Sequence, residues 1–211
     1  MALVKLNNRG VRSATTFGSI SALGEMRFIK KLTASSSSTL SFVDGSSDVV
    51  LDVTYKEYLF TFNSIHPATN NANFTFNGSD DDSSHSYDVI KTTTAFDAFH
   101  KEDGSSSNLS YRTSEDIAEG TGFQTLTLDG GVGNNNDDNF NGYLHLFNPS
   151  STTFVKHFLA KTTHGYNASP AFVMNSFIAG YFNTTADITA IQFKFASGNI
   201  DAGDICLYGI N

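Results

Sequence analysis

Apolar side chains recur at every second position through much of the chain after residue 25. In the segment 55–65, Tyr58, Phe60 and Phe62 fall on one face of an extended chain, and Leu59, Thr61 and Asn63 fall on the other. A period of two is the pattern of a half-buried β-strand. Pro67 then ends this strand, because proline cannot donate a ladder hydrogen bond.

The same pattern predicts short strands along the rest of the chain. Turn-forming runs of Gly, Ser, Asn and Asp separate them at intervals of roughly 8 to 12 residues. At 77–79 a turn leads into the acidic loop 80–82, so 72–76 is expected to begin a hairpin with a long loop. A turn at 114–119 is the single helical candidate. The expected strands are 26–32, 39–43, 55–65, 72–76, 87–92, 95–100, 108–113, 123–128, 140–147, 154–163, 172–182, 188–195 and 205–210.

This succession of strands predicts an all-β fold, an antiparallel two-sheet sandwich. A jelly-roll-like arrangement is the first choice, because it needs no disulfide and places long loops at the ends of the sandwich. An immunoglobulin-like sandwich is the second. The segment 1–24 lacks a sustained period and is interpreted as an extended N-terminal arm, followed by one sandwich domain at 25–211. Within the arm, the candidate assembly contacts are Leu3, Val4, Leu6, Val11 and Phe17.

Composition agrees with this fold and adds detail about the core. The chain has 211 residues, of which 39% are hydrophobic, and it contains 19 Phe and 8 Tyr but no Trp. The core is therefore expected to be rich in phenylalanine. The single cysteine, Cys206, excludes an internal disulfide and is interpreted as a small buried hydrophobe.

Charge and hydropathy narrow the set of partners. The formal net charge is -8 with 13 Lys and Arg residues, which disfavours nucleic acid as a partner. No run of about 18 apolar residues is present for a membrane span, and the first residues lack the apolar stretch of a signal peptide. We therefore expect folding in a cytoplasm and no membrane partner.

The search for reaction chemistry yields weak candidates. None of the six histidines stands in a metal-binding spacing, and no serine lies in a nucleophile elbow. The acidic clusters 80–82 and 137–138 are the possible carboxylates of a glycan hydrolase, with Asp82 and Asp138 as the residues to replace. The loop 129–139 has ligands for calcium but not the EF-hand order, and a solvated loop is favoured. The expectation is no enzyme, no metal and no cofactor.

Exposed tyrosines beside polar loops offer a different kind of site. Tyr87 and Tyr166 are candidates for stacking on a sugar ring while neighbouring Asn and Asp side chains bind its hydroxyls. A receptor-binding, lectin-like adhesin module with a host surface glycan as partner is therefore the alternative function.

Several segments carry a resemblance to a known family. They are 28–35 (FIKKLTAS), 55–60 (YKEYLF), 65–71 (IHPATNN), 146–151 (LFNPSS) and the C-terminal 188–210, with its IDAG turn and final LYGI. Together they resemble the β-sandwich virion proteins of marine tailed phages, including cyanophages, over most of residues 26–210. In that comparison the C-terminal segment looks like a closing hairpin, with Gly198 and Gly203 in its turn.

The resemblance implies a non-enzymatic structural protein of a tailed-phage virion, made in the host cytoplasm and displayed on the particle exterior as capsid decoration or part of a fibre. Its implied partners are other capsid or tail proteins and further copies of the chain, with a trimer favoured. The arm 1–24 is the expected anchor. The resemblance carries no catalytic residues to this chain.

Overall fold

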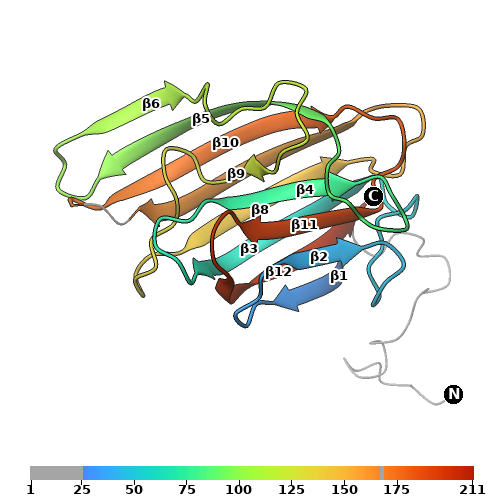
Figure 1. The fold of residues 1–211 in the computed structure, drawn as a ribbon, viewed down its shortest axis with the longest axis horizontal. Helices are drawn as coiled ribbons and strands as arrows, with labels where there is room; N and C mark the ends of the chain where they lie inside the picture. Colours follow the sequence, from blue (N-terminus) through green and yellow to red (C-terminus); the bar gives the residue numbers. More distant parts are fainter. Residues whose placement is uncertain (1–25, 167–168) are drawn as a thin grey trace, which may run out of the picture.

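The computed structural model describes residues 26–166 and 169–211, which form two antiparallel sheets (Figure 1). The larger sheet contains, in spatial order, β1 (Met26–Thr33), β12 (Ile200–Ile210), β3 (Glu57–Pro67), β8 (Phe140–Phe147), β9 (Lys156–Tyr166), β10 (Phe172–Phe182), β5 (Lys91–Lys101) and β6 (Ser107–Tyr111). The smaller sheet contains β2 (Leu40–Val43), β11 (Ala190–Phe195), β4 (Phe74–Ser79) and β7 (Gln124–Thr125). The predicted all-β sandwich is confirmed.

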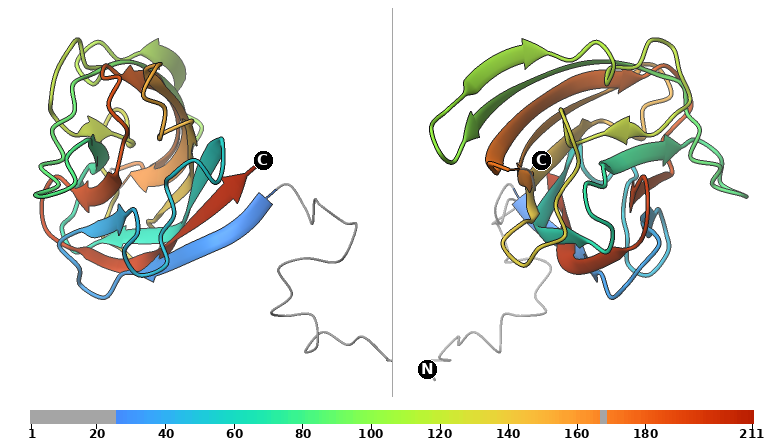
Figure 2. Two further views of the ribbon diagram at one scale, coloured as in Figure 1. Left: turned by 90° about the vertical axis from the view of Figure 1, so that its right-hand side faces the viewer. Right: turned by 60° about the vertical axis from the view of Figure 1, so that its left-hand side comes forward.

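The larger sheet curves over the smaller one, and the core lies between them (Figure 2). Phenylalanine rings dominate this core, as the composition predicts. Phe193 of β11 meets Phe62 of β3 edge-to-face, with ring centroids 5.2 Å apart, and Phe76 meets Phe158 in the same way at 5.1 Å. Edge-to-face contacts of this kind add to the free energy gained from burial. The buried rings include Phe42, Phe60, Phe62, Phe74, Phe76, Phe140, Phe158, Phe182, Phe193 and Phe195.

The first and last strands pair with each other, whereas β8, β9 and β10 pair in sequence order. β1 pairs with the last strand, β12, in the larger sheet, and β2 pairs with β11 in the smaller sheet. The pair β2–β11 is thus nested within the pair β1–β12 in the sequence, and the chain changes sheet between β1 and β2 and again between β11 and β12. Cys206 lies on β12 and is buried, as expected.

The C-terminal segment is not a hairpin, which corrects the expectation drawn from the resemblance. β11 and β12 belong to different sheets, so the chain crosses the sandwich between them. Gly198 takes a φ of +70° in this connection, whereas Gly203 lies inside β12, with a φ of +114°, where the pairing with β3 shifts register. A Cβ at Gly203 would stand 2.5 Å from the carbonyl oxygen of Ser64, so the bulge requires glycine.

Two other local predictions are wrong. The expected turn at 77–79 is part of β4, and the side chain of Asn77 is buried there, where it donates to the carbonyl oxygens of Tyr87 and Thr121. The expected strands 87–92 and 95–100 are replaced by the single strand β5, preceded by Tyr87 at a φ of +51°. In the first case a buried polar side chain, Asn77, was mistaken for a turn residue.

Residues 114–119 form a turn, with the amide of Asp116 donating to the carbonyl oxygen of Arg112. Within the described ranges no helix is long and apolar enough to cross a membrane. The proposed arm, including Leu3, Val4, Leu6, Val11 and Phe17, lies outside the described residues.

Candidate functional site

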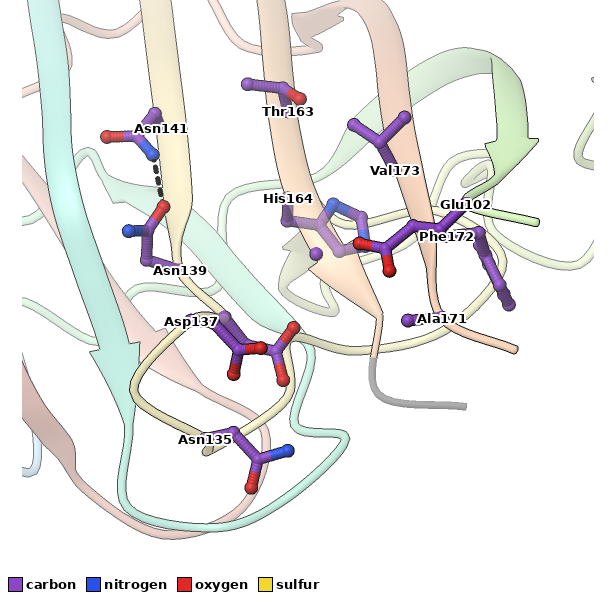
Figure 3. Close-up of a pocket in the computed structure, with 12 residues that line it drawn as sticks. Glu102, Asn135, Asp137, Asn139, Asn141, Thr163, His164, Ala171, Phe172 and Val173 are labelled. Atoms are coloured by element: carbon purple, nitrogen blue, oxygen red, sulfur yellow. Dashed lines mark hydrogen bonds between the residues drawn. The ribbon is translucent and has the colours of Figure 1, made fainter. Parts of the chain in front are cut away.

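A polar pocket of about 340 Å³ opens at one end of the sandwich, where β9 ends and β10 begins (Figure 3). Carboxylate and amide side chains supply most of its polar lining. In Figure 3, Glu102 and Asp137 stand on opposite sides of the pocket, and His164 projects from β9 between them. The lining residues are Glu102, Asn135, Asp137, Asp138, Asn139, Asn141, Thr163, His164, Gly165, Ala171, Phe172 and Val173.

Backbone hydrogen bonds bring three separate segments to this end of the sheet. The amide of Glu102, in the turn after β5, donates to the carbonyl oxygen of Ala171 at 2.9 Å. The amide of Asp138 donates to the carbonyl oxygen of Asn135, also at 2.9 Å, which folds the acidic loop back on itself. Because β9 and β10 pair without a register shift, Gly165 lies directly opposite Val173. The pocket therefore rests on fixed backbone.

The acidic side chains of the pocket influence one another. Asp138 is 8% exposed, and burial raises its pKa. The charge of Asp137 raises it further, and that of Glu102 contributes in the same direction. The ionised form of a carboxyl group in this position is stabilised by a ligand that donates hydrogen bonds or carries positive charge.

His164 is the most deeply buried polar group of the pocket, at 2% exposed. Neither ring nitrogen makes a hydrogen bond of ordinary geometry to another described residue. Burial lowers the pKa of His164 to about 4, although a backbone group of Gly130 acts in the opposite direction. The ring is therefore neutral at pH 7, and the ring nitrogen that does not face the backbone of Gly130 is left without a hydrogen-bond partner.

An aromatic pair forms one wall. Phe172 lines the pocket, and the ring of Tyr166 lies against it with centroids 4.6 Å apart. Tyr166 in turn covers Gly130, which has a φ of +124°, and a Cβ there would come within 2.5 Å of the tyrosine ring. Glycine at this position thus allows the tyrosine to support the wall.

The structure separates the two tyrosines that the sequence proposes as glycan contacts. Tyr166 lies beside the pocket, opposite Phe172 in the pairing of β9 with β10. Tyr87 lies toward the other end of β10, since its carbonyl oxygen accepts from Asn77 of β4 and the neighbouring Gly78 packs against Phe182. A strand of eleven residues spans roughly 35 Å, so the two rings cannot contact one small ligand.

The two acidic clusters are separated in the same way. Asp80 lines a different hollow, next to Asn183 at the far end of β10, whereas Asp137 and Asp138 line the pocket. In the first cluster, Asp81 accepts from the hydroxyls of Ser83 and Ser84, and these hydrogen bonds lower its pKa. Asp82 and Asp138 therefore do not form the carboxylate pair of one glycosidase site.

The loop 129–139 does not gather its oxygen ligands around one point. Asp129 is held by Arg112, at 2.6 Å, and its amide donates to the carboxylate of Glu115. Asp137 and Asp138 face the pocket instead. In residues 26–166 and 169–211 no group of three His, Cys, Asp or Glu side chains is arranged to hold a metal ion.

A second surface feature lies on the outer face of the larger sheet, which no other described element covers. The register places one residue from each of five neighbouring strands in a line across this face. We call this line the outer row; it consists of Tyr143, Lys161, Phe177, Phe96 and Tyr111.

The outer row is apolar apart from its lysine, and much of it is accessible. Phe96 and Phe177 stack at 4.9 Å, and the ammonium group of Lys161 lies 5.3 Å from the ring centroid of Phe177. Phe96 and Tyr143 are 42% and 41% exposed. A hollow of about 240 Å³ borders the row beside Leu159.

Sequence reasoning missed Glu102, Phe172 and the outer row as a unit. Glu102 lies in a turn, which gave no sign that it would reach the pocket. The alternation of Phe96 with Asp97 does not show which face of their strand is the outer one. The adjacent acids at 137–138 and the tyrosine Tyr166 were the available signals for the pocket.

Comparisons of this chain with protein-family models, with curated proteins and with solved structures find no match.

Proposed function

We propose that this chain is a non-enzymatic structural protein of a tailed-phage virion, displayed on the particle exterior as capsid decoration or part of a fibre. The observation that carries the proposal is the outer row. Five strands present a continuous, largely apolar line on a face that no described element covers, and exposed apolar patches of this kind mark protein contacts. Neighbouring capsid or tail proteins and further copies of the chain, in a trimer, are the proposed partners.

The arrangement of the resembling segments supports this proposal. They fall on β1, β12, β3 and the end of β8, which are consecutive neighbours in the larger sheet, and on β11 of the smaller sheet. Segments far apart in the sequence thus assemble into one half of the molecule. A resemblance spread over one contiguous structural unit carries more weight than the same short matches scattered over the surface.

The arm 1–24 is proposed as the anchor, and particle labelling tests it. Particles are assembled with either the full chain or a chain lacking residues 1–24, and are imaged with gold-labelled antibody against the sandwich. We expect gold on the outside of particles made with the full chain and none on particles made with the shortened chain.

Absence of the full chain from purified particles contradicts the virion role. Labelling of particles that carry the shortened chain contradicts the anchor alone, so the two parts of the proposal fail separately. Circular dichroism of the shortened chain should show the same β signal as the full chain, which controls for loss of folding.

A glycan-recognising adhesin module is the second candidate. The polar pocket beside Tyr166 is the observation that favours it. Adhesion and a structural role are compatible in one chain, because none of the residues that line the pocket belongs to the outer row.

A further inference from the structure

We infer that the polar pocket binds one ring of a neutral, hydroxyl-rich saccharide. Its volume of about 340 Å³ is at the small end of the range for small-molecule sites, roughly 300 to 1,000 Å³, which suits a single sugar unit. The inference rests on the second candidate function, glycan recognition, and not on the virion role, since none of the pocket's lining residues belongs to the outer row.

Hydrogen-bond acceptors dominate the lining. Glu102, Asp137 and Asp138 provide carboxylates, and three asparagines provide amides that can both donate and accept. Hydroxyl groups bind this combination well, because each hydroxyl donates one bond and accepts others. None of the described lining residues is Lys or Arg, so a sugar that carries a carboxylate or sulfate meets repulsion with no compensating cation.

The buried histidine points to a ligand independently of the acids. His164 is 2% exposed, lines the pocket and makes no ordinary hydrogen bond through either ring nitrogen. Buried polar groups in native proteins are nearly always paired. A sugar hydroxyl can donate a hydrogen bond to the ring nitrogen that does not face the backbone of Gly130.

The aromatic wall fits the apolar face of a sugar ring. Phe172 lines the pocket, and Tyr166 holds it from behind at 4.6 Å. Sugars combine a face of C–H groups with a rim of hydroxyls, and this pocket offers an aromatic ring beside a rim of acceptors. The role that the sequence assigned to Tyr166 thus passes to Phe172, with Tyr166 as its support.

The test is saturation-transfer NMR and calorimetry on the full chain with methyl glucoside, methyl mannoside and methyl galactoside as probes. We expect at least one of them to bind saturably. The glucuronic acid glycoside, which has the same ring with a carboxylate, should bind at least about tenfold more weakly than the glucoside. Replacing Glu102 and Asp137 together by alanine should weaken binding about tenfold or more, because hydrogen bonds to charged groups are lost.

Matched controls separate the pocket from general effects. Asp82→Ala removes an exposed carboxylate at the other end of the sandwich, and Phe154→Leu replaces a phenylalanine that is 70% exposed in a loop. Neither should change the affinity, whereas Phe172→Leu should reduce it. The inference is overturned if none of the three neutral glycosides binds, if the glucuronide binds equally well, or if the double alanine variant, with an unchanged melting temperature, binds as the original chain does.

Discussion

At the scale of single residues, His164 links the pocket to acid stability. In the folded protein its pKa is lowered to about 4 by burial, whereas an unfolded histidine titrates near 6.5. Between these values the unfolded chain binds a proton that the folded protein does not. Falling pH therefore favours unfolding from about 6.5 downward, and the full cost of about 3 kcal/mol is reached below about pH 4.

We expect the free energy of unfolding to fall by about 3 kcal/mol more between pH 7 and pH 4 in the original chain than in His164→Gln. Urea titrations at a series of pH values measure this difference. His157→Gln is the matched control, because His157 lies on the same strand but on the exposed face. Equal pH profiles for the original chain and His164→Gln would contradict the assignment.

Residue patterns predicted the core well, since Phe62 and Phe193 alternate with polar neighbours and are buried as expected. They failed where polar side chains are buried. Asn77 is an example: its amide donates to loop carbonyls inside the molecule, and nothing in the local sequence distinguishes that from an exposed turn.

At the scale of elements, β5 depends on a buried network of polar groups. Its inner face carries Lys91, Thr93 and Asp97, and the loop after β6 covers this part of the sheet. Thr93 donates to the side-chain oxygen of Gln124 at 2.6 Å, and Lys91 donates to the carbonyl oxygen of Gly122, also at 2.6 Å. The loop after β6 and Gln124 of β7 therefore supply hydrogen-bond partners to the polar side chains on the inner face of β5.

Arg112 is the main connection in this network. It donates two hydrogen bonds to the carboxylate of Asp97, at 2.7 and 3.0 Å, and Asp97 is fully buried. Removing the guanidinium leaves a buried charge without its partner. We expect Arg112→Met to lower the free energy of unfolding by about 3 to 5 kcal/mol in urea denaturation.

Arg27→Met is the control for Arg112→Met, because Arg27 lies exposed on the edge strand β1, and it should change stability by no more than about 0.5 kcal/mol. The double variant Arg112→Met with Asp97→Asn should recover part of the loss, since the uncompensated charge is gone. A loss with Arg112→Met no larger than with Arg27→Met would show that the pair is not structural.

At the scale of the whole molecule, the outer row is expected to drive self-association. Phe96→Ser combined with Tyr143→Ser removes two half-exposed rings from the row without entering the core. We expect sedimentation velocity to show oligomers for the original chain and monomers for this variant. Phe154→Ser, which removes a more exposed phenylalanine from a loop, should leave the oligomer intact. A monomeric original chain, or an oligomeric double variant, would contradict the role of the row.

The position of β12 has a consequence for how the molecule is made. This late strand lies between β1 and β3, and β1 has no other strand partner among the described residues. While residues 200–210 are still on the ribosome, the nascent chain therefore exposes two bare backbone edges, and such edges invite pairing with other chains. Closure requires contacts between the most distant described parts of the sequence, which is the slow kind of folding step. Synthesis up to Ile210 thus sets the earliest moment at which the larger sheet can close.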